Sequence, residues 1–397
     1  MLESIRNFLQ GTGVALLFGQ DGWWKTLVMY AIVAVLVYLA VVRKYEPLLL
    51  LPIAIGMLLT NLPGAEMFHF EMWITDPQPT VVESIRMVLD KGGFLDLIYM
   101  GVKLGIFPCL VFIGIGAMTD FSPLIASPSN LLIGGGAQLG VFAAFSLALV
   151  SGMFSPQEAA AIGIIGGADG PTAVLTAKTL APQLLGAIAI AAYSYMALIP
   201  MIQPPFMKLI TTKKERMIRM KTLRSVSKLE KICFPVLVTL VVGLIVPAAV
   251  PLIGCLMFGN LLNVSGVTER LSKTAQNELI NIVTIMLGLS VGATATAEQF
   301  LDPRTLLIIA CGLCAFCIST CGGLVTAKIM CWITRGKINP LIGSAGVSAV
   351  PMAARVAQKV GQEEDPSNFL LMHAMGPNVA GVIGSAIAAG VFLSWAF

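Results

Sequence analysis

Apolar runs long enough to cross a lipid bilayer constrain this chain more than any other feature. Three examples are Leu131 to Val150, Leu184 to Gln203 and Arg304 to Trp332. Each approaches or exceeds the roughly 20 residues that an α-helix needs to span the hydrocarbon core. Of all residues, 57% are hydrophobic and only 12% are charged, unlike soluble domains. We therefore expect an all-α polytopic integral membrane protein of the cell membrane, with about ten spanning or re-entrant helices.

One apolar run, Ile162 to Pro182, is interrupted. It contains GGADGPT, Gly166 to Thr172, in which glycines and a proline favour backbone outside the helical well. A helix that begins near Glu158 should break here and resume at the end of the motif. Asp169 lies at this break, and an ionised carboxylate at membrane depth needs a compensating cation, donor cluster or water. Freed backbone carbonyls would complete an oxygen site for Na⁺ or H⁺. The competing interpretation is a kinked helix whose Asp169 only caps the second half.

Positive charge gathers in one polar segment, residues 207–231. Nine of the 25 basic residues lie there, namely Lys208, Lys213, Lys214, Arg216, Arg219, Lys221, Arg224, Lys228 and Lys231. By the positive-inside rule this segment is cytoplasmic. We expect a solvated loop, with a helix lying on anionic lipid or a docking face for a soluble partner as alternatives. The patch is too short to favour nucleic acid binding.

The second half of the chain repeats part of the first. INPLIGS, Ile338 to Ser344, matches FSPLIAS, Phe121 to Ser127, and a downstream GPN motif, Gly376 to Asn378, parallels GGADGPT. Gly/Pro-interrupted segments at matching places in two halves are typical of transporters with inverted repeats, whose broken helices meet near the bilayer midplane. We therefore expect two broken helices, with Asp169 and Asn378 facing each other across one ion site.

These patterns divide the chain into five parts. We expect an N-terminal helical hairpin with a polar connector (1–93), a first repeat (94–206), the basic loop (207–231), connecting helices (232–337) and a second repeat (338–397).

Polar side chains also occur inside other apolar stretches. Tyr193 and Tyr195 lie within a span, so each hydroxyl needs either a neighbouring carbonyl or a group of the site as its partner. Arg355 follows SAVPMAA, where a guanidinium cannot face lipid cheaply. It should point at the protein interior or an aqueous vestibule, where it suits a carboxylate-bearing substrate. Snorkelling of Arg355 toward the cytoplasm is the alternative.

Four cysteines follow the spacing of an iron–sulfur ferredoxin motif: Cys311, Cys314, Cys317 and Cys321. On one helix they would cover a stripe roughly 120° wide, with no loop to wrap a cluster. We interpret them as small residues of a packing face. Only two histidines occur in the chain, which further disfavours a transition-metal centre.

Four longer motifs resemble a known family. GGADGPT, YSYMALIPMIQPP, NPLIGSAGVSAVPMAARV and HAMGPNVAGVIGSAIAAGV resemble the membrane β subunit of the sodium-pumping, biotin-dependent decarboxylases of oxaloacetate, methylmalonyl-CoA or glutaconyl-CoA. The resemblance runs from about Phe94 to the C-terminus. It implies a subunit that removes CO₂ from carboxybiotin and couples this to outward Na⁺ transport, with consumption of a proton.

The resemblance also implies partners and site residues. Carboxybiotin would come from a biotinylated carboxyltransferase or biotin-carrier subunit, a small γ or δ membrane subunit would be present, and the core would be a homotrimer that moves in an elevator-like way. This chain has no convincing biotin-attachment motif of its own. Matched motif by motif, the family's important polar positions fall on Asp169, Tyr195, Asn339, Gly343, Ser348, Arg355 and Asn378.

The roles that follow are hypotheses. Arg355 and Asn339, beside Gly343, would hold the carboxylated ureido ring. Tyr195 with Ser348 would relay the proton, and Asp169 with Asn378 would bind Na⁺. The alternative is a Na⁺-coupled carrier for a carboxylate in which no bond is broken, because broken helices serve carriers and pumps alike.

Overall fold

The computed structural model describes residues 2–73 and 80–395, and all regular secondary structure in these ranges is helical. The first elements are α1 (Leu2–Gln10), α2 (Gly13–Gly19), α3 (Trp23–Val41), α4 (Pro47–Thr60), η1 (Phe70–Trp73), α5 (Val81–Lys91), α6 (Phe94–Lys103) and α7 (Ile106–Met118). Then follow α8 (Ser122–Ala126), α9 (Asn130–Ala137), α10 (Leu139–Val150), α11 (Pro156–Gly163), η2 (Ile164–Gly167), α12 (Gly170–Leu180), η3 (Pro182–Leu184) and α13 (Leu185–Ile210).

The remaining elements follow the basic segment. They are α14 (Lys213–Arg216), α15 (Lys228–Ile245), η4 (Pro247–Ala249), α16 (Val250–Val264), α17 (Glu269–Thr274), η5 (Ala275–Leu279) and α18 (Ile280–Ala293). The chain ends with α19 (Ala297–Phe300), α20 (Pro303–Ile333), η6 (Pro340–Gly346), α21 (Met352–Glu364) and α22 (Leu371–Ser394).

Five helical stretches of the described chain are long and apolar enough to cross a membrane. They are α3, α9 with α10, η4 with α16, α20 and α22. The number rises to seven if two bent stretches, α6 with α7 and η3 with α13, each count as one span. The predicted helical, polytopic membrane protein is confirmed, whereas the count of about ten elements is not.

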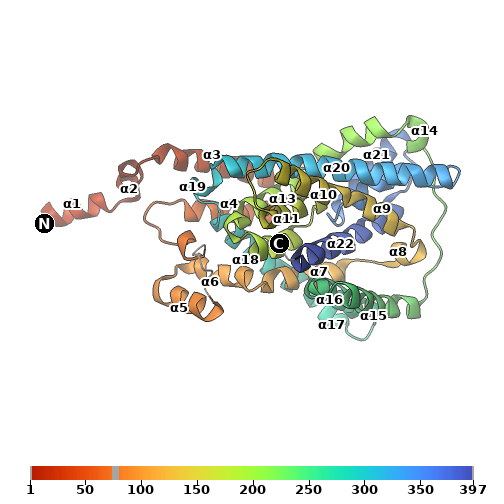
Figure 1. Cartoon of the computed structure of the whole chain (residues 1–397), viewed down its shortest axis with the longest axis horizontal. Helices are drawn as coiled ribbons and strands as arrows, with labels where there is room; N and C mark the ends of the chain where they lie inside the picture. Colours follow the sequence, from red (N-terminus) through yellow and green to blue (C-terminus); the bar gives the residue numbers. More distant parts are fainter. Residues whose placement is uncertain (1, 74–79, 396–397) are drawn as a thin grey trace.

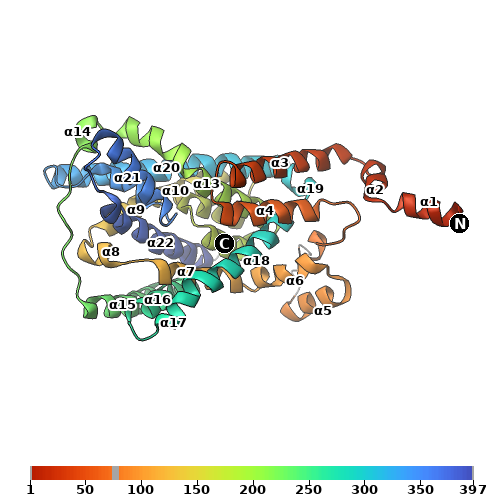
Figure 2. The same ribbon diagram turned by 180° about the vertical axis from the view of Figure 1, so that it is seen from behind.

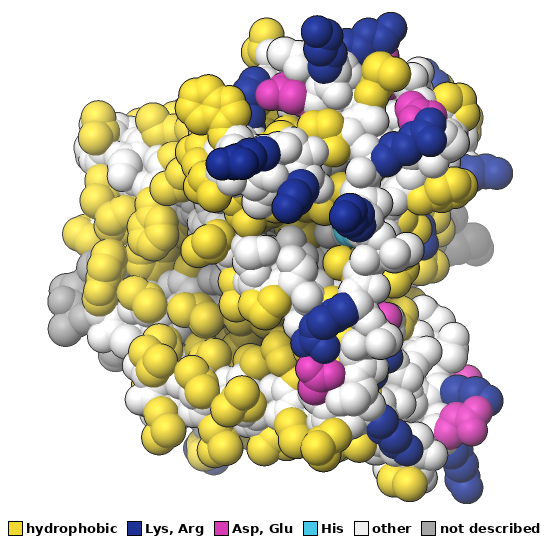
Figure 3. Space-filling model, turned by 90° about the vertical axis from the view of Figure 1, so that its right-hand side faces the viewer, with side chains coloured by type: hydrophobic (Ala, Val, Ile, Leu, Met, Phe, Trp, Pro, Cys, Tyr) yellow, Lys and Arg dark blue, Asp and Glu magenta, His cyan; other side chains and the backbone are white. Residues whose placement is uncertain are grey.

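The basic segment marks one end of the molecule. It passes from α14 to α15 along the right-hand edge of Figure 1, and Figure 3 shows Lys and Arg side chains gathered on that face. We call this face the basic end. α20 extends away from it for about 46 Å over its 31 residues. Lys328, near the end of α20, pairs with Glu215 of the basic segment at 3.4 Å.

The GGADGPT motif forms the tip of a helical hairpin. α11 begins at a capping box of Ser155 and Glu158, passes into η2, and breaks before α12, as predicted. The chain then turns back, because Gln183, just after α12, donates to Glu158 at 3.0 Å. Arg304, at the start of α20, binds the same carboxylate at 2.8 Å. We call residues 156–180 hairpin 1, and it enters from the end opposite the basic end.

A second hairpin enters from the basic end. η6 leads inward and α21 returns outward. Asn339, before η6, and Asn368, after α21, both donate to the Arg216 carbonyl, at 2.9 and 3.1 Å, so both arms begin at the basic segment. We call residues 339–364 hairpin 2. The two hairpins therefore enter the molecule from opposite ends.

The interruption in the second half does not lie at GPN. α22 is continuous through Pro377, so the expectation that this motif breaks a helix is wrong. Pro377 removes only one backbone donor. The adjacent Asn378 amide donates to the carbonyls of Ala345 and Val347 at 2.9 and 2.7 Å, which anchors α22 to hairpin 2. The non-helical break lies instead at the tip of hairpin 2, between η6 and α21.

Hairpin 1 is held by a large apolar core. α4 packs along α18 (Figure 2), and Gly292 permits this because a Cβ there would overlap the Ile53 carbonyl. The same hydrophobic cluster continues from Met57 to Ile162 of hairpin 1 and Ile188 of α13. Close packing on several sides fixes the position of the hairpin tip.

Candidate functional site

The tip of hairpin 1 places one carboxylate in the protein interior. The chain reverses at Ala168, whose φ of 55° lies in the left-handed region that residues with a Cβ rarely adopt. Asp169 follows as the N-cap of α12 and accepts from the Thr172 N–H at 3.3 Å. Asp169 is only 4% exposed. It does cap the second helix, but this contact uses only one of its two carboxylate oxygens.

The second oxygen belongs to a chain of hydroxyl groups that joins the two hairpins. The Ser348 N–H of hairpin 2 donates to the Gly167 carbonyl of hairpin 1 at 3.0 Å. The Ser348 hydroxyl donates to Ser385 Oγ of α22 at 3.0 Å, and Ser385 donates to Asp169 Oδ2 at 2.9 Å. The Val382 carbonyl, 3.0 Å from Ser385 Oγ, is an alternative acceptor. All three side chains are buried, so the tips meet at a buried chain of oxygens.

Oxygen atoms without a hydrogen-bond partner surround this tip. Among the described residues, they include Thr172 Oγ1, Tyr193 OH and Gln138 Oε1, which are all buried. Tyr193 packs so closely on Gly170 that a Cβ there would overlap its ring, and Gln138 Oε1 lies 3.6 Å from an ideal Cβ on Gly167. Buried polar atoms normally have a partner. Unused oxygens beside a carboxylate fit a hard cation with oxygen ligands.

Asn378 does not meet Asp169 directly. The residue of α22 that does so is Ser385, two helical turns later and about 10 Å along the axis. Asn378 donates instead to carbonyls of hairpin 2, and its Oδ1 is buried without a partner in the described structure. The spacing of seven places both residues on one face of α22. This face therefore contacts both hairpin tips.

Tyr195 faces away from Asp169. Its hydroxyl donates to the Ile309 carbonyl of α20, and its ring lies beside Gly312 of the same helix. The hydroxyl of Tyr195 is thus bonded to a neighbouring carbonyl, which was one of the two alternatives for this residue. The tyrosine that lies against the tip of hairpin 1 is Tyr193.

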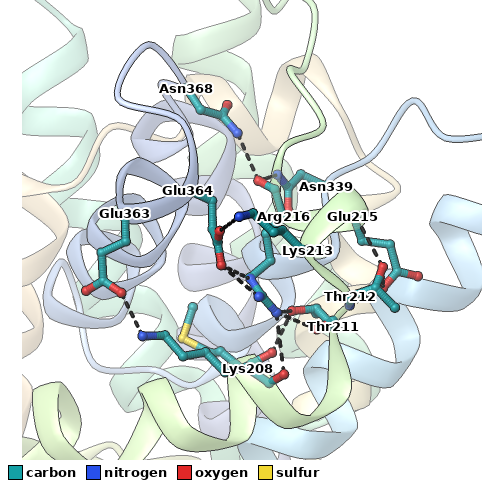
Figure 4. A network of polar contacts seen from close by, with 11 residues as sticks. Lys208, Thr211, Thr212, Lys213, Glu215, Arg216, Asn339, Glu363, Glu364 and Asn368 are labelled. Carbon is teal, nitrogen blue, oxygen red and sulfur yellow. Dashed lines mark hydrogen bonds and ion pairs between the residues drawn. The ribbon is translucent and has the colours of Figure 1, made fainter.

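Asn339 lies at the base of hairpin 2, in the polar network of Figure 4. Its Nδ2 donates to the carbonyls of Arg216 and Ile218, both at 2.9 Å, and its Oδ1 accepts from the Leu341 N–H at 3.0 Å. Both N–H groups of the amide are thus used within the protein. Asn368 donates to the same two carbonyls at 3.1 and 3.2 Å. The structure therefore joins Asn339 to the basic segment.

Ion pairs complete this network. The Arg216 guanidinium donates from Nε and from a terminal nitrogen to one oxygen of Glu364, at 3.0 and 2.7 Å. Arg219 bonds Asp365 at 2.7 Å. These hydrogen bonds lower the pKa of Glu364 and bring the pKa of Asp365 to about 2. The segment that we expected to be a solvated loop is bonded to the base of hairpin 2.

Gly343 serves close packing in η6. A Cβ at this position would overlap the Gly323 carbonyl of α20 and press on Ala327. Its absence allows hairpin 2 to approach α20 backbone to backbone.

Arg355 lies on the exposed face of α21, near the tip of hairpin 2. It makes no hydrogen bond or ion pair within the described chain, although its charge interacts with the Glu46 carboxylate at the start of α4. Nine residues separate it from Glu364 at the base, about 13 Å along the helix. A guanidinium at that depth requires water, a substrate or another subunit. Its position favours a vestibule over snorkelling at the basic end.

Two residues of this site were not predicted. Ser385 could have been identified from its spacing, because it follows Asn378 by seven residues and so shares its helix face. Gln138 is the one amide in the apolar run from Leu131 to Val150. An isolated polar side chain within a span is itself a functional signal.

Comparison with known proteins identifies the family. The sequence matches the Na⁺-transporting oxaloacetate decarboxylase beta subunit family over residues 25–396, which extends beyond the region of the recognised motifs. It is 54% identical over 403 aligned positions to the methylmalonyl-CoA decarboxylase subunit beta of Propionigenium modestum, with 99% of both chains covered. It is 51% identical over 434 positions to the oxaloacetate decarboxylase beta chain of Klebsiella pneumoniae, again with 99% of both chains covered.

A third relative carries a different substrate name. The glutaconyl-CoA decarboxylase subunit beta of Acidaminococcus fermentans is 55% identical over 371 positions, which cover 94% of this chain and 93% of the relative. Identity does not separate the three substrate classes. Together with the helical spans, these matches confirm the predicted family and location: the chain belongs to the β subunits of the Na⁺-transporting decarboxylases and is a multi-pass subunit of the cell membrane.

Proposed function

We propose that this chain removes CO₂ from carboxybiotin presented by a partner subunit and couples the reaction to outward Na⁺ transport. The observation that carries the proposal is the buried chain from Ser348 through Ser385 to Asp169, between two hairpin tips that enter from opposite ends. A site between two such tips can open to either side of the membrane by a modest displacement of one hairpin.

Na⁺ would bind at the tip of hairpin 1. Asp169 would supply the negative charge, and Ser385, Thr172, Tyr193 and Gln138 would supply neutral oxygens, three of which have no partner in the described structure. Without Na⁺, the buried carboxylate would take up a proton, because an uncompensated charge at this depth is unfavourable. Exchange of Na⁺ for H⁺ on one carboxylate would then link transport to chemistry. Asn378 would hold the neighbouring tip of hairpin 2 in place.

The reaction needs little beyond a desolvated carboxylate and a proton. The bond between the carboxylate carbon and the ureido nitrogen breaks, CO₂ leaves, and the nitrogen takes up the proton. A proton held by Asp169 would pass through Ser385 to Ser348. Arg355 would hold the carboxylate before it reacts. Tyr195 would join the proton path only after its hydroxyl leaves the Ile309 carbonyl.

Asn339 and Gly343 would act on the substrate through hairpin 2. Asn339 fixes the base of the hairpin to the basic segment, and Gly343 allows its close contact with α20. Correct placement of the tip would therefore depend on both residues. Both residues would keep their internal contacts, and the ureido ring of carboxybiotin would bind at the tip.

The coupling has a minimum energetic requirement. Moving one charge outward against ~100 mV costs ~2.3 kcal/mol. Each tenfold Na⁺ gradient adds ~1.4 kcal/mol. One decarboxylation must supply at least the sum of these two terms for each ion moved.

The names of the relatives, subunit beta and beta chain, imply that further subunits are present. We propose a complex with a biotinylated carboxyltransferase or biotin-carrier subunit and a small γ or δ membrane subunit, around a homotrimer of this chain. The carboxyltransferase would select the acyl substrate. A Na⁺-coupled carrier that breaks no bond is not favoured, because the relatives are named as decarboxylase subunits.

Purification of the complex followed by reconstitution tests the proposal. An avidin blot should detect a biotinylated partner that copurifies with this chain, and Na⁺ uptake should require decarboxylation. Asp169→Asn should abolish both Na⁺ uptake and Na⁺-dependent CO₂ release. Retention of Na⁺ uptake by that variant would contradict the assignment of Asp169 to the Na⁺ site. Decarboxylation without any biotinylated partner would contradict carboxybiotin as the substrate.

A further inference from the structure

A groove of about 590 Å³ lies beneath the basic segment, at the basic end. One wall is the irregular segment that crosses from α14 to α15 past α8 in Figure 1, and the other is formed by the starts of α8 and α22. Arg219, Arg224 and Lys231 line one side, and Phe369 and His373 line the other. The groove therefore combines positive charge with apolar surface.

Three cationic side chains line this groove, of which Arg219 pairs with Asp365 and Arg224 with Glu230, both outside the lining. Lys231 makes no hydrogen bond or ion pair with any described residue, and Arg219 uses only its Nε, on Asp365. Asp120 is the acidic residue among the lining groups, and it already accepts from Ser122. His373 is 7% exposed, and its Nδ1 has no partner in the described part of the chain. Donors thus remain available for an anion.

A second, apolar groove lies next to this polar one along α15. Pro235 follows Lys231 by one helical turn and lies on the same face of the helix. It is the first residue of a second groove, of about 330 Å³, between α15 and α16. Leu240, Gly254 and Phe258 line it further along. A cationic groove and an apolar groove thus lie one helical turn apart along the same face of α15.

We propose that the two grooves together bind an anionic phospholipid. Its phosphate would lie at Lys231, Arg224 and Arg219, and one acyl chain would follow α15 from Pro235 to Gly254. Basic pockets between helices on the cytoplasmic side are suited to acidic lipid head groups. The exposed side chains of α15 beyond Lys231, such as Leu237 and Leu244, are apolar and suited to lipid. Free phosphate would leave the second groove unused.

This site goes beyond the proposed reaction, because it touches neither Asp169 nor the hairpin tips. It contacts the basic segment, which is bonded to the base of hairpin 2 through Arg216 and Arg219. A bound lipid would therefore hold that segment against the start of α22.

Lipid retention by the purified complex tests the charge requirement. The complex is freed of lipid, mixed with phosphatidylglycerol or phosphatidylcholine of equal chain length, and analysed by native mass spectrometry. We expect preferential retention of phosphatidylglycerol and a roughly fivefold weaker preference in Lys231→Gln, because one Lys near an anionic lipid surface is worth about that factor. Lys221→Gln is the matched control, since Lys221 is exposed and outside the groove. Equal retention of both lipids by wild type would overturn the proposal.

A second variant tests the apolar arm. A Cβ on Gly254 would have Val250 Cγ1, at 3.8 Å, as its nearest neighbour, so Gly254→Leu fits α16 and fills the groove. We expect weaker retention of both lipids in this variant. Unchanged retention, together with displacement of phosphatidylglycerol by glycerol phosphate, would indicate a phosphate site only and reject the lipid. If the isolated chain retains phosphatidylglycerol but the complex does not, a helix of a partner subunit occupies the groove, and the lipid proposal is rejected as well.

Discussion

Asp96 and Asp169 are both buried carboxylates, but their surroundings differ. Asp96 is fully buried and accepts from the backbone N–H groups of His69 and Gly93 and from Trp73 Nε1. In addition, His69 Nδ1 lies 2.7 Å from Asp96 Oδ2. Asp169 is buried almost as deeply, yet a single backbone N–H donates to it, at 3.3 Å, and its other neighbours are the hydroxyls of Ser385 and Thr172. Several oxygens near it have no partner in the described structure.

The difference separates a structural carboxylate from an exchangeable one. Donors from the protein satisfy both oxygens of Asp96, so this carboxylate ties η1 and the segment before it to the start of α6. Asp169 lacks enough donors for this and is instead surrounded by oxygens. A carboxylate that is short of donors can alternate between a proton and a cation at lower cost than a saturated one.

Removing the two carboxylates should lower the stability of the chain by different amounts. Asp96→Ala leaves several buried donors unpaired and should lower the free energy of unfolding by about 3 kcal/mol. Asp169→Ala should cost about 1 kcal/mol, since it removes one helix cap and one hydroxyl contact. Thermal unfolding of the purified chain checks both values. A larger loss for Asp169→Ala than for Asp96→Ala would contradict the comparison.

The hydroxyl beside Asp169 should matter for Na⁺ rather than for folding. Ser385→Ala removes a bond to the carboxylate and should raise the Na⁺ concentration for half-maximal activity about tenfold. Ser394→Ala, in the same helix and bonded only to the Gly390 carbonyl, is the control. An unchanged Na⁺ dependence in Ser385→Ala would remove Ser385 from the site.

Asn339 resembles Asp96 in that its hydrogen bonds are all made within the protein. Because Asn368 holds the same two carbonyls, Asn339→Ala or Asn368→Ala alone should cost about 1 kcal/mol or less, and the double variant more than the sum. A double-mutant cycle by thermal unfolding, read beside the KM and kcat of each variant, checks this. If Asn339→Ala alone raises KM while Asn368→Ala changes nothing, Asn339 contacts the substrate directly.

The smallest expected effect is on pH-dependent stability, and it comes from Glu364, a carboxylate outside the membrane that is hydrogen-bonded within the protein. The hydrogen bond from Arg216 lowers the pKa of Glu364. This bond therefore stabilises the folded chain fully at a pH above the ordinary pKa of Glu, and the stabilisation is lost as the pH falls through the lowered pKa. Proteolysis of the basic segment should therefore accelerate below about pH 4. Glu364→Gln should be cleaved faster at neutral pH and show a flatter pH profile. Identical profiles for wild type and variant would rule this contribution out.

The sequence predicted those features that depend on local chemistry. Glycines, a proline and one carboxylate in GGADGPT were enough to predict the helix break and to mark Asp169, because each residue acts on its own backbone. The GPN motif gave a similar signal but lies in a continuous helix. A proline in a span is tolerated when neighbouring groups satisfy the backbone, and only tertiary contacts decide this.

The roles of other residues could not be predicted, because they depend on contacts between distant parts of the chain. Tyr193 and Tyr195 are about 200° apart around their helix, and only the packing shows that Tyr193 faces the tip. The bond from Ser385 to Asp169 joins residues 216 positions apart. The use of Asn339 as an anchor for the basic segment spans more than a hundred residues as well.

Equilibrium binding of radioactive Na⁺ to the purified complex tests the central claim most directly. Wild type and Asp96→Asn should bind Na⁺ with the same affinity, because Asp96 is saturated by protein donors. Asp169→Asn should bind none above background. Wild-type Na⁺ binding by Asp169→Asn, or its loss in a folded Asp96→Asn, would contradict the account.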